Sequence, residues 1–164
     1  MARTIAKDHD QKRAQILASA AKVFAEAGFD RATMTQLASE CGISKANIYH
    51  YYDSKDAILY DILETYLSGL RDRICRIDLA GLGPQDRLYR VVHEILFAYQ
   101  GSDHEHRVQV NGVEKLPPAQ QQVLRGYQRE MVSFLGGIIR DIAPEVFDGD
   151  KAKLRAATMS VFGM

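Results

Sequence analysis

The sequence of 164 residues contains few of the features that point directly to a partner or a compartment. Its 21 basic and 21 acidic residues cancel, so net charge alone indicates neither a nucleic-acid nor a membrane partner. Its two cysteines, Cys41 and Cys75, form no C-x-x-C pair and are predicted to be small core residues in a reducing compartment. No apolar run approaches the roughly 18 residues of a membrane span, and the charged N-terminus does not look like a signal peptide. These absences favour a cytoplasmic protein with no membrane partner.

Motifs of catalysis are also missing. There is no G-x-S-x-G, no Walker loop and no dinucleotide-binding fingerprint, so we predict no enzyme, no catalytic residue and no cofactor. Four residues invite a rival interpretation as a metal-dependent hydrolase: His93, His104, Glu105 and His106. The two histidines of the H-x-H pair would diverge near a helix start, and no H-E-x-x-H accompanies them. A metal site therefore stays a remote alternative, and no metal is predicted.

What the sequence does contain is helical periodicity. Apolar residues recur on one face of a segment that starts at Asp10 and that Gly28 ends: Ile16, Leu17, Ala20, Val23, Phe24 and Ala27. Thr33 then begins T-x-x-Q, a capping box for a helix that runs through Cys41. Gly42 ends that helix, and Ser44 is placed to cap another over about 45–52. The order is helix, tight glycine-containing turn, helix.

Longer helices follow. The spacing predicts them over 54–77, from Pro84 to Gly101, within 102–116 and from "PPAQQQ" to just before Pro144, with a last one from near Asp148 to Met164. No strand pattern competes, so the predicted class is all-α. The last helix shows no stop signal, which suggests that the chain continues beyond residue 164.

The two-helix unit with its turn is the layout of a helix-turn-helix DNA reader, whose second helix enters the major groove. Lys45 suits the O6 and N7 atoms of guanine, and Asn47 suits the N6 and N7 atoms of adenine. Tyr49, Tyr51 and Lys55 offer hydroxyls and a cation to phosphates. The alternative is a solvated polar helix with incidental tyrosines.

Residues 12–59 resemble the DNA-binding domain of the TetR/AcrR family of bacterial repressors. The likeness lies in "ILASAAKVFAEAGFDRATMTQLASECGISKANIYHYYDSKDAIL". The resemblance implies contacts to bases from Lys45, Ala46, Asn47 and His50 and to phosphates from Thr35, Tyr49, Tyr51 and Lys55, with Ser44 at the start of the reading helix. The usual Gly-Thr after the lysine is Ala46-Asn47 here, so the operator of no relative can be transferred to this chain.

The resemblance also implies a domain order: a flexible arm over 1–9, a three-helix helix-turn-helix domain over 10–55, and a C-terminal helical domain for effector binding and dimerisation over 56–164. Arg3, Lys7, Lys12 and Arg13 belong either to an arm that touches the minor groove or to a solvated tail. Such readers bind pseudo-palindromic operators in double-stranded DNA as homodimers. Four residues of the last helix are expected in that interface, which would be incomplete here and dimerise weakly: Leu154, Ala157, Val161 and Phe162.

A family member of this kind is expected to release DNA when it binds a small hydrophobic or acyl-CoA-type effector. The candidate pocket residues are Tyr66, Leu70, Phe97, Tyr99, Arg107, Tyr127, Met131 and Phe134. Residues 107–131 and 157–164 resemble the branch that senses CoA thioesters in fatty-acid, steroid or aromatic-acid catabolism, where Arg107, Arg125 and Arg129 would meet phosphates. The apolar and aromatic candidates are more typical of plain core than of a pocket wall, and the arginines fit surface salt bridges as well as phosphates. A DNA-binding scaffold without an effector is the remaining alternative.

Overall fold

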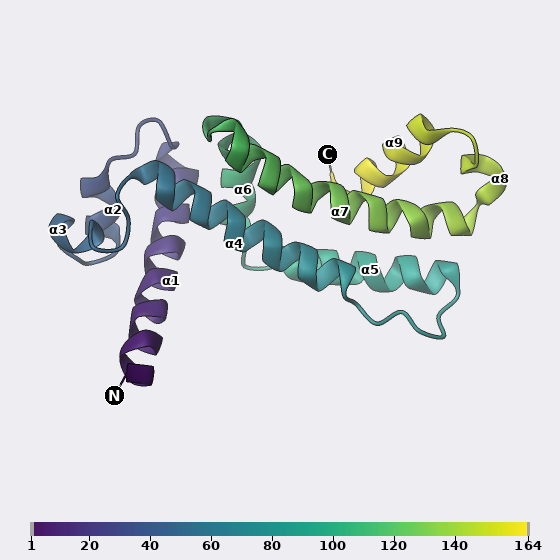
Figure 1. The fold of residues 1–164 in the computed structure, drawn as a ribbon. Coiled ribbons are helices and arrows are strands. Elements are labelled where there is room, and N and C mark those ends of the chain that lie inside the picture. Colours follow the sequence, from purple (N-terminus) through teal and green to yellow (C-terminus); the bar gives the residue numbers. More distant parts are fainter. Residues whose placement is uncertain (1, 164) are drawn as a thin grey trace. The chain divides into compact units, whose positions relative to one another are not determined.

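The computed structural model describes residues 2–163, with side chains from His9 onward, and every regular element in that range is a helix. The elements are α1 (Ala2–Ala27), α2 (Met34–Glu40), α3 (Lys45–Ile48), α4 (Lys55–Cys75), α5 (Pro84–Tyr99), α6 (Asp103–Gly112), the 3-10 helix η1 (Val113–Lys115), α7 (Pro118–Ile142), α8 (Pro144–Phe147) and α9 (Lys151–Phe162), all drawn in Figure 1. The predicted all-α class is confirmed within the described residues.

The chain divides into two compact units. The first comprises the described residues through Tyr66 together with Ser102–Gln121, and the second comprises Leu67–Gly101 and the described residues from Gln122 onward. Helix α4 contributes to both units, because the division falls in its middle. The expected boundary at residues 55 and 56 differs from this division, in which α6 and η1 belong with the three N-terminal helices.

The core of the first unit is built from α1, α2, α3, α4 and α6. Helix α1 packs on α2 and α6, and α2 packs on α3. The fully buried residues of this unit include Ile16, Ala20, Leu37, Ile48, Ile58 and Leu63. Gly112 lets the end of α6 lie against α4, because a Cβ there would come within 3.2 Å of the Leu59 side chain. Burying these apolar side chains fixes α2 and α3 on their supporting helices.

The second unit is a helical core formed by α5, α7, α9 and the C-terminal part of α4. Its most buried side chains are Leu67, Ile74, Val91, Ile95, Leu124 and Leu135. Helix α9 approaches α7 closely, because a Cβ on Gly136 would lie 3.3 Å from Oγ1 of Thr158. Thr158 is itself buried, and its hydroxyl donates to the carbonyl of Leu154 at 2.8 Å, so it carries no unpaired polar group into the core.

Two ends of predicted helices were wrong, and one short helix was not predicted. Helix α1 begins at Ala2, not near Asp10, because residues 2–9 hold no glycine or proline to interrupt it. Helix α9 ends at Phe162, where Gly163 adopts a φ of 71° and caps it in the left-handed conformation, so the last helix does have a stop signal. Helix α8, which starts at Pro144, was not predicted. Its four residues are too few to show a helical period.

Candidate nucleic-acid interface

The start of α2 is fixed by the capping box that the sequence predicts. The backbone N–H of Gln36 donates to Oγ1 of Thr33 at 3.2 Å, and the N–H of Thr33 donates to Oε1 of Gln36 at 2.9 Å. Each side chain thus satisfies a backbone donor that the first helical turn leaves free. Lys22 adds an ion pair with Glu40 at 2.7 Å, which joins α1 to the end of α2.

The turn between α2 and α3 depends on Gly42, which has a φ of 63°. A side chain at this left-handed position would be strained, so glycine is the favoured residue. Past the turn, Oγ of Ser44 accepts the N–H of Asn47 at 3.1 Å and caps α3. Ile48 is fully buried and anchors α3 in the core of the unit.

Helix α3 is shorter than predicted: it ends at Ile48, not at about residue 52. The N–H of His50 donates to the carbonyl of Asn47 at 3.1 Å, and that of Tyr51 donates to the carbonyl of Ile48 at 3.0 Å. Such bonds over three residues wind the chain more tightly than an α-helix. As a result Tyr49, His50 and Tyr51 lie on a turn.

The outer side of α3 and this turn is polar and open. Lys45, Ala46 and His50 are exposed, Asn47 is half-buried and the Tyr49 ring is 44% exposed. Lys45 forms no ion pair with any side chain that the structure describes. Ser44 and Thr35 of α2 are exposed as well, although the Ser44 hydroxyl is used in the cap. Exposed donors without a partner inside the chain are suited to contact DNA bases and phosphates.

Tyr51, expected at a phosphate, is half-buried and stacks on His9 of α1, with the ring centroids 4.9 Å apart and the planes inclined by 29°. Arg3 and Lys7, which were considered for a DNA-binding arm, lie outside the residues whose side chains the structure describes. Lys12 is exposed.

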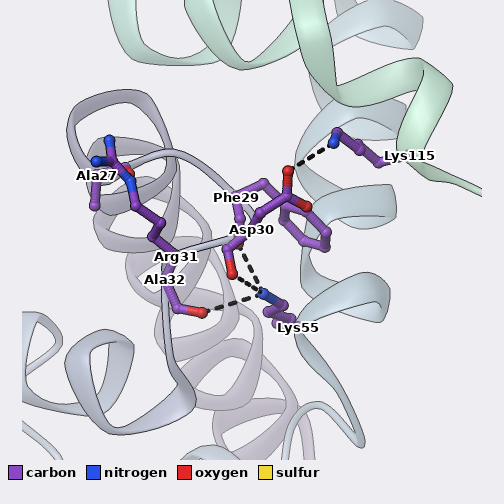
Figure 2. A network of polar contacts seen from close by, with 7 residues as sticks. All are labelled: Ala27, Phe29, Asp30, Arg31, Ala32, Lys55 and Lys115. Carbon is purple, nitrogen blue, oxygen red and sulfur yellow. Dashed lines mark hydrogen bonds and ion pairs between the residues drawn. The ribbon is translucent and has the colours of Figure 1, made fainter.

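Lys55 occupies a different environment from the one expected of a phosphate-binding residue. Its ammonium donates to three backbone carbonyls of the loop before α2, those of Phe29 at 2.8 Å, Asp30 at 3.1 Å and Ala32 at 3.2 Å (Figure 2). It also lies 4.5 Å from the centre of the Phe29 ring. All three of its N–H donors are accounted for, and we therefore assign Lys55 a structural role.

The same loop is tied to η1. Nζ of Lys115 lies 2.6 Å from Oδ2 of Asp30, and Figure 2 shows this pair beside the contacts of Lys55. The hydrogen bond from Lys115 lowers the pKa of the Asp30 carboxyl. Residues 30 and 115 are far apart in the sequence, and no local pattern predicts that they meet.

A second network joins α1 to α4. Nη2 of Arg13 lies 2.7 Å from Oδ2 of Asp61, and its Nε donates to the Tyr52 hydroxyl at 3.1 Å. Tyr52, which is buried, donates its hydroxyl to Asp61. Burial, followed by this bond to Asp61, raises the pKa of Tyr52 well above its usual value. The predicted arm residue Arg13 thus has partners inside the unit.

The proposed effector residues do not share one environment. In the first unit, Tyr66 lines a cavity of about 260 Å³ with residues of α1 and α4, and its hydroxyl lies 3.4 Å from Nδ1 of His106. Arg107 lines another cavity of about 610 Å³, together with Phe24, Phe29 and Asn111. The sequence pattern suggested neither grouping.

The remaining candidates belong to the second unit. Leu70 and Met131 are buried, Phe134 is half-buried, and burial raises the pKa of the half-buried Tyr99. Two aromatic rings lie under guanidinium groups. Tyr127 is 5.0 Å from Arg71, and Phe97, which is 55% exposed, is 4.9 Å from Arg73.

Of the expected dimer residues on α9, three are half-buried: Leu154, Ala157 and Val161. Phe162 is 5% exposed and packs inside the second unit, so it is not a surface residue of this chain. The reason is helical spacing, since Phe162 follows the buried Thr158 by four residues and shares its face.

The described residues hold no group of three or more His, Cys, Asp or Glu side chains that could bind a metal ion. Within residues 2–163, none of the helices is both long and apolar enough to cross a membrane.

Comparison with known proteins gives the family. Residues 16–62 match the family model described as "Bacterial regulatory proteins, tetR family". A TetR-family transcriptional regulator from Bordetella parapertussis has a similar structure, with a TM-score of 0.86 and 30% identity over 93% of this chain and 79% of that one. AibR, solved with isovaleryl coenzyme A and operator DNA, has a TM-score of 0.77 at 18% identity over 93% of this chain and 82% of its own, a likeness of fold.

Among curated relatives, the transcriptional repressor KstR2 of Rhodococcus jostii is 30% identical over 95 residues, which are 58% of this chain and 45% of that protein. The matched regions cover between 26% and 50% of each of eight such regulators, so the chain spans about half or less of their length. These relatives are transcriptional regulators and not enzymes. Taken with the helix-turn-helix geometry, the matches establish that this chain belongs to the TetR family.

Proposed function

We propose that this protein is a sequence-specific DNA-binding transcriptional regulator that represses by occupying an operator. One observation carries the proposal: the outer side of α3 and the following turn is exposed and rich in donors, while Ile48 of the same helix is fully buried. Lys45, Ala46, Asn47 and His50 face the bases, and Thr35 and Tyr49 face phosphates. The buried isoleucine holds this surface in place.

The active form proposed is a homodimer on a pseudo-palindromic site. A reading helix of four residues offers too little surface for useful affinity alone, and two copies at half-sites one or more helical turns apart multiply the contacts. On α9, Leu154, Ala157 and Val161 are the residues proposed for the interface, because they are half-buried and Phe162 faces inward.

The effector proposed is a small molecule of the acyl-CoA type. Two things support it: the likeness of residues 107–131 to CoA-thioester sensors, and the description of AibR, a fold neighbour, as a complex with isovaleryl coenzyme A and operator DNA. A ligand that favours one arrangement of α4 would change the spacing of the two reading helices. Linkage requires that the effector and the DNA then weaken each other by the same factor.

The experiment is selection of bound sequences from random duplex DNA, followed by mobility shifts on the selected site with and without isovaleryl coenzyme A and longer acyl-CoA esters. We expect a two-fold symmetric sequence and release by at least one ester. Selection of no sequence would refute the DNA-binding proposal. A selected operator that no ester releases would refute the effector class and favour a DNA-binding scaffold.

A further inference from the structure

His9 lies on α1 beside the turn that follows α3. Its ring stacks on Tyr51, with the ring centroids 4.9 Å apart and the planes inclined by 29°. One helical turn further along α1, Nε of Arg13 donates to the Tyr52 hydroxyl at 3.1 Å. His9 and Arg13 stand four residues apart and share a face of the helix. Two successive contacts thus fix this face of α1 against residues 51 and 52.

The stack changes which side chain at this turn is available to DNA. The family likeness implies a phosphate contact from Tyr51, but the ring of Tyr51 is half-buried and stacked on His9. The His9 side chain is 57% exposed. Tyr49 and His50, the two residues before Tyr51, are exposed as well. His9 therefore lies next to the exposed residues that are proposed to contact DNA, with its own donors open to solvent.

The charges near His9 leave its ring free to respond to a partner. The titratable and charged residues with described side chains on α1 and on the turn packed against His9 are Asp10, Lys12, Arg13, His50, Tyr51 and Asp53. Oδ1 of Asp10 lies 3.9 Å from Nδ1 of His9, and Arg13 is paired with Asp61 at 2.7 Å. A nearby carboxylate favours the charged imidazole, but the Asp10 side chain is 80% exposed and its effect is weak.

The chemistry of imidazole connects such a contact with pH. Histidine is the side chain that ordinarily changes its charge between about pH 5 and 8. A phosphate within reach favours the protonated form, because opposite charges stabilise each other. A histidine that a bound phosphate holds in its charged form takes up a proton on binding. By linkage, the affinity for DNA then rises as the pH falls through this range.

We propose that His9 is a further DNA contact of this chain, and that it binds an operator phosphate as an imidazolium, so that operator binding takes up a proton. This contact rests on the proposed DNA-binding function. It adds α1 to the surface formed by α3 and the following turn. In the proposed homodimer, each subunit supplies one such histidine.

The test is fluorescence anisotropy of the full chain on the selected operator at pH 6 and pH 8, at constant ionic strength. The original protein should bind about tenfold more tightly at pH 6, since both subunits take up a proton. His9→Phe keeps a ring to stack on Tyr51 but has no charge, and should lose most of this ratio while its affinity at pH 8 stays within about twofold. His9→Arg, which is charged at both pH values, should bind at pH 8 about as tightly as the original protein does at pH 6.

Two controls and a second readout make the test specific. His93→Phe, at an exposed histidine of α5, should keep the full ratio between the two pH values. Circular dichroism confirms that each variant is folded. At pH 6, the slope of log affinity against log salt concentration should be steeper for the original protein than for His9→Phe by roughly 0.9 per subunit.

Three outcomes would overturn the proposal. A ratio that persists in His9→Phe and disappears in His50→Gln would assign the proton to His50. Equal weakening of His9→Phe at both pH values would mean that His9 acts only through the position of Tyr51. Operator binding by the original protein that does not change with pH would refute the proton uptake and leave the proposed function standing, whereas absence of operator binding at either pH would refute both.

Discussion

The outer side of α3 and the first turn of α4 lie ten residues apart in the sequence, and each carries a lysine. Lys45 on α3 is exposed and forms no ion pair with the described residues. Lys55 at the start of α4 is half-buried, with its ammonium on three carbonyl oxygens at 2.8 to 3.2 Å. The first region is open to a partner outside the chain, whereas the second holds the unit together.

The difference shows that residue type and spacing alone do not distinguish a residue that contacts DNA from one that stabilises the fold. Both lysines suit phosphate or base contacts by chemistry alone. The loop at residues 29–32 decides between them, since its carbonyls are the acceptors for Lys55, whereas the Lys45 side chain forms no hydrogen bond or ion pair with the described residues. Changing one region should therefore affect stability, and changing the other should affect DNA recognition.

The largest effect is expected at Ile48, the buried residue that packs α3 against the core. Ile48→Ala should lower the free energy of unfolding by about 3 to 4 kcal/mol, because it leaves a cavity at a fully buried site. Operator binding should weaken as well, since the reading surface loses its support. Urea unfolding checks the first effect and mobility shifts the second. Full stability in this variant would mean that α3 does not depend on the core for its position.

Lys55→Met is the next largest change. It keeps the apolar stem but removes the ammonium from three carbonyls, and we expect a loss of about 2 kcal/mol in unfolding free energy. Lys45→Met is the matched control, and its stability should stay within about 0.5 kcal/mol of the original protein. Equal stability in both variants would contradict the structural role of Lys55. If Lys55→Met lowered the salt dependence of DNA binding and Lys45→Met did not, Lys55 would be assigned a contact with a phosphate.

Much of the helix-turn-helix could be predicted from sequence because its signals are local. The capping box at Thr33, the turn at Gly42 and the cap at Ser44 act within three or four residues, and all three occur in the structure. The early end of α3 could not be predicted, because Tyr49, His50 and Tyr51 are compatible with a helix. Ile48 and Tyr52 are both buried, at the four-residue spacing that a continuous helix would also give.

The ion pairs that stabilise the first unit could not be predicted either, and the reason is different. Arg13 and Asp61, like Asp30 and Lys115, are brought together only when separate helices pack. The pairing of α6 and η1 with the N-terminal helices, likewise, follows from tertiary contacts such as the close approach of Gly112 to Leu59. Charged residues at such distances in a sequence have many equally good partners.

On the open region, Lys45→Ala and Asn47→Ala should each relax base preference at one operator position by about 1 to 2 kcal/mol without changing stability. Lys153→Ala, at an exposed lysine of α9, is the control and should leave the preference intact. Competition binding on operators mutated at single positions measures the effect. Uniform weakening on every sequence would place these residues on phosphates instead.

The smallest effect concerns Tyr52, which follows the turn after α3 and bonds to Arg13 and Asp61. Tyr52→Phe removes a hydroxyl that accepts from Arg13 and donates to Asp61, and should cost about 1 kcal/mol at neutral pH. Since the folded pKa of Tyr52 is raised above the unfolded value of about 10, the folded protein keeps a proton that the unfolded chain releases. The hydroxyl's contribution to the free energy of unfolding is thus complete below about pH 10 and falls as the pH rises beyond it.

Urea unfolding at pH 8 to 11 should show that the difference in unfolding free energy between the original protein and Tyr52→Phe shrinks above pH 10. Tyr49→Phe, at an exposed ring, supplies the control series, and a constant difference for Tyr52→Phe across this range would show that the buried hydroxyl does not hold its proton more tightly in the folded state.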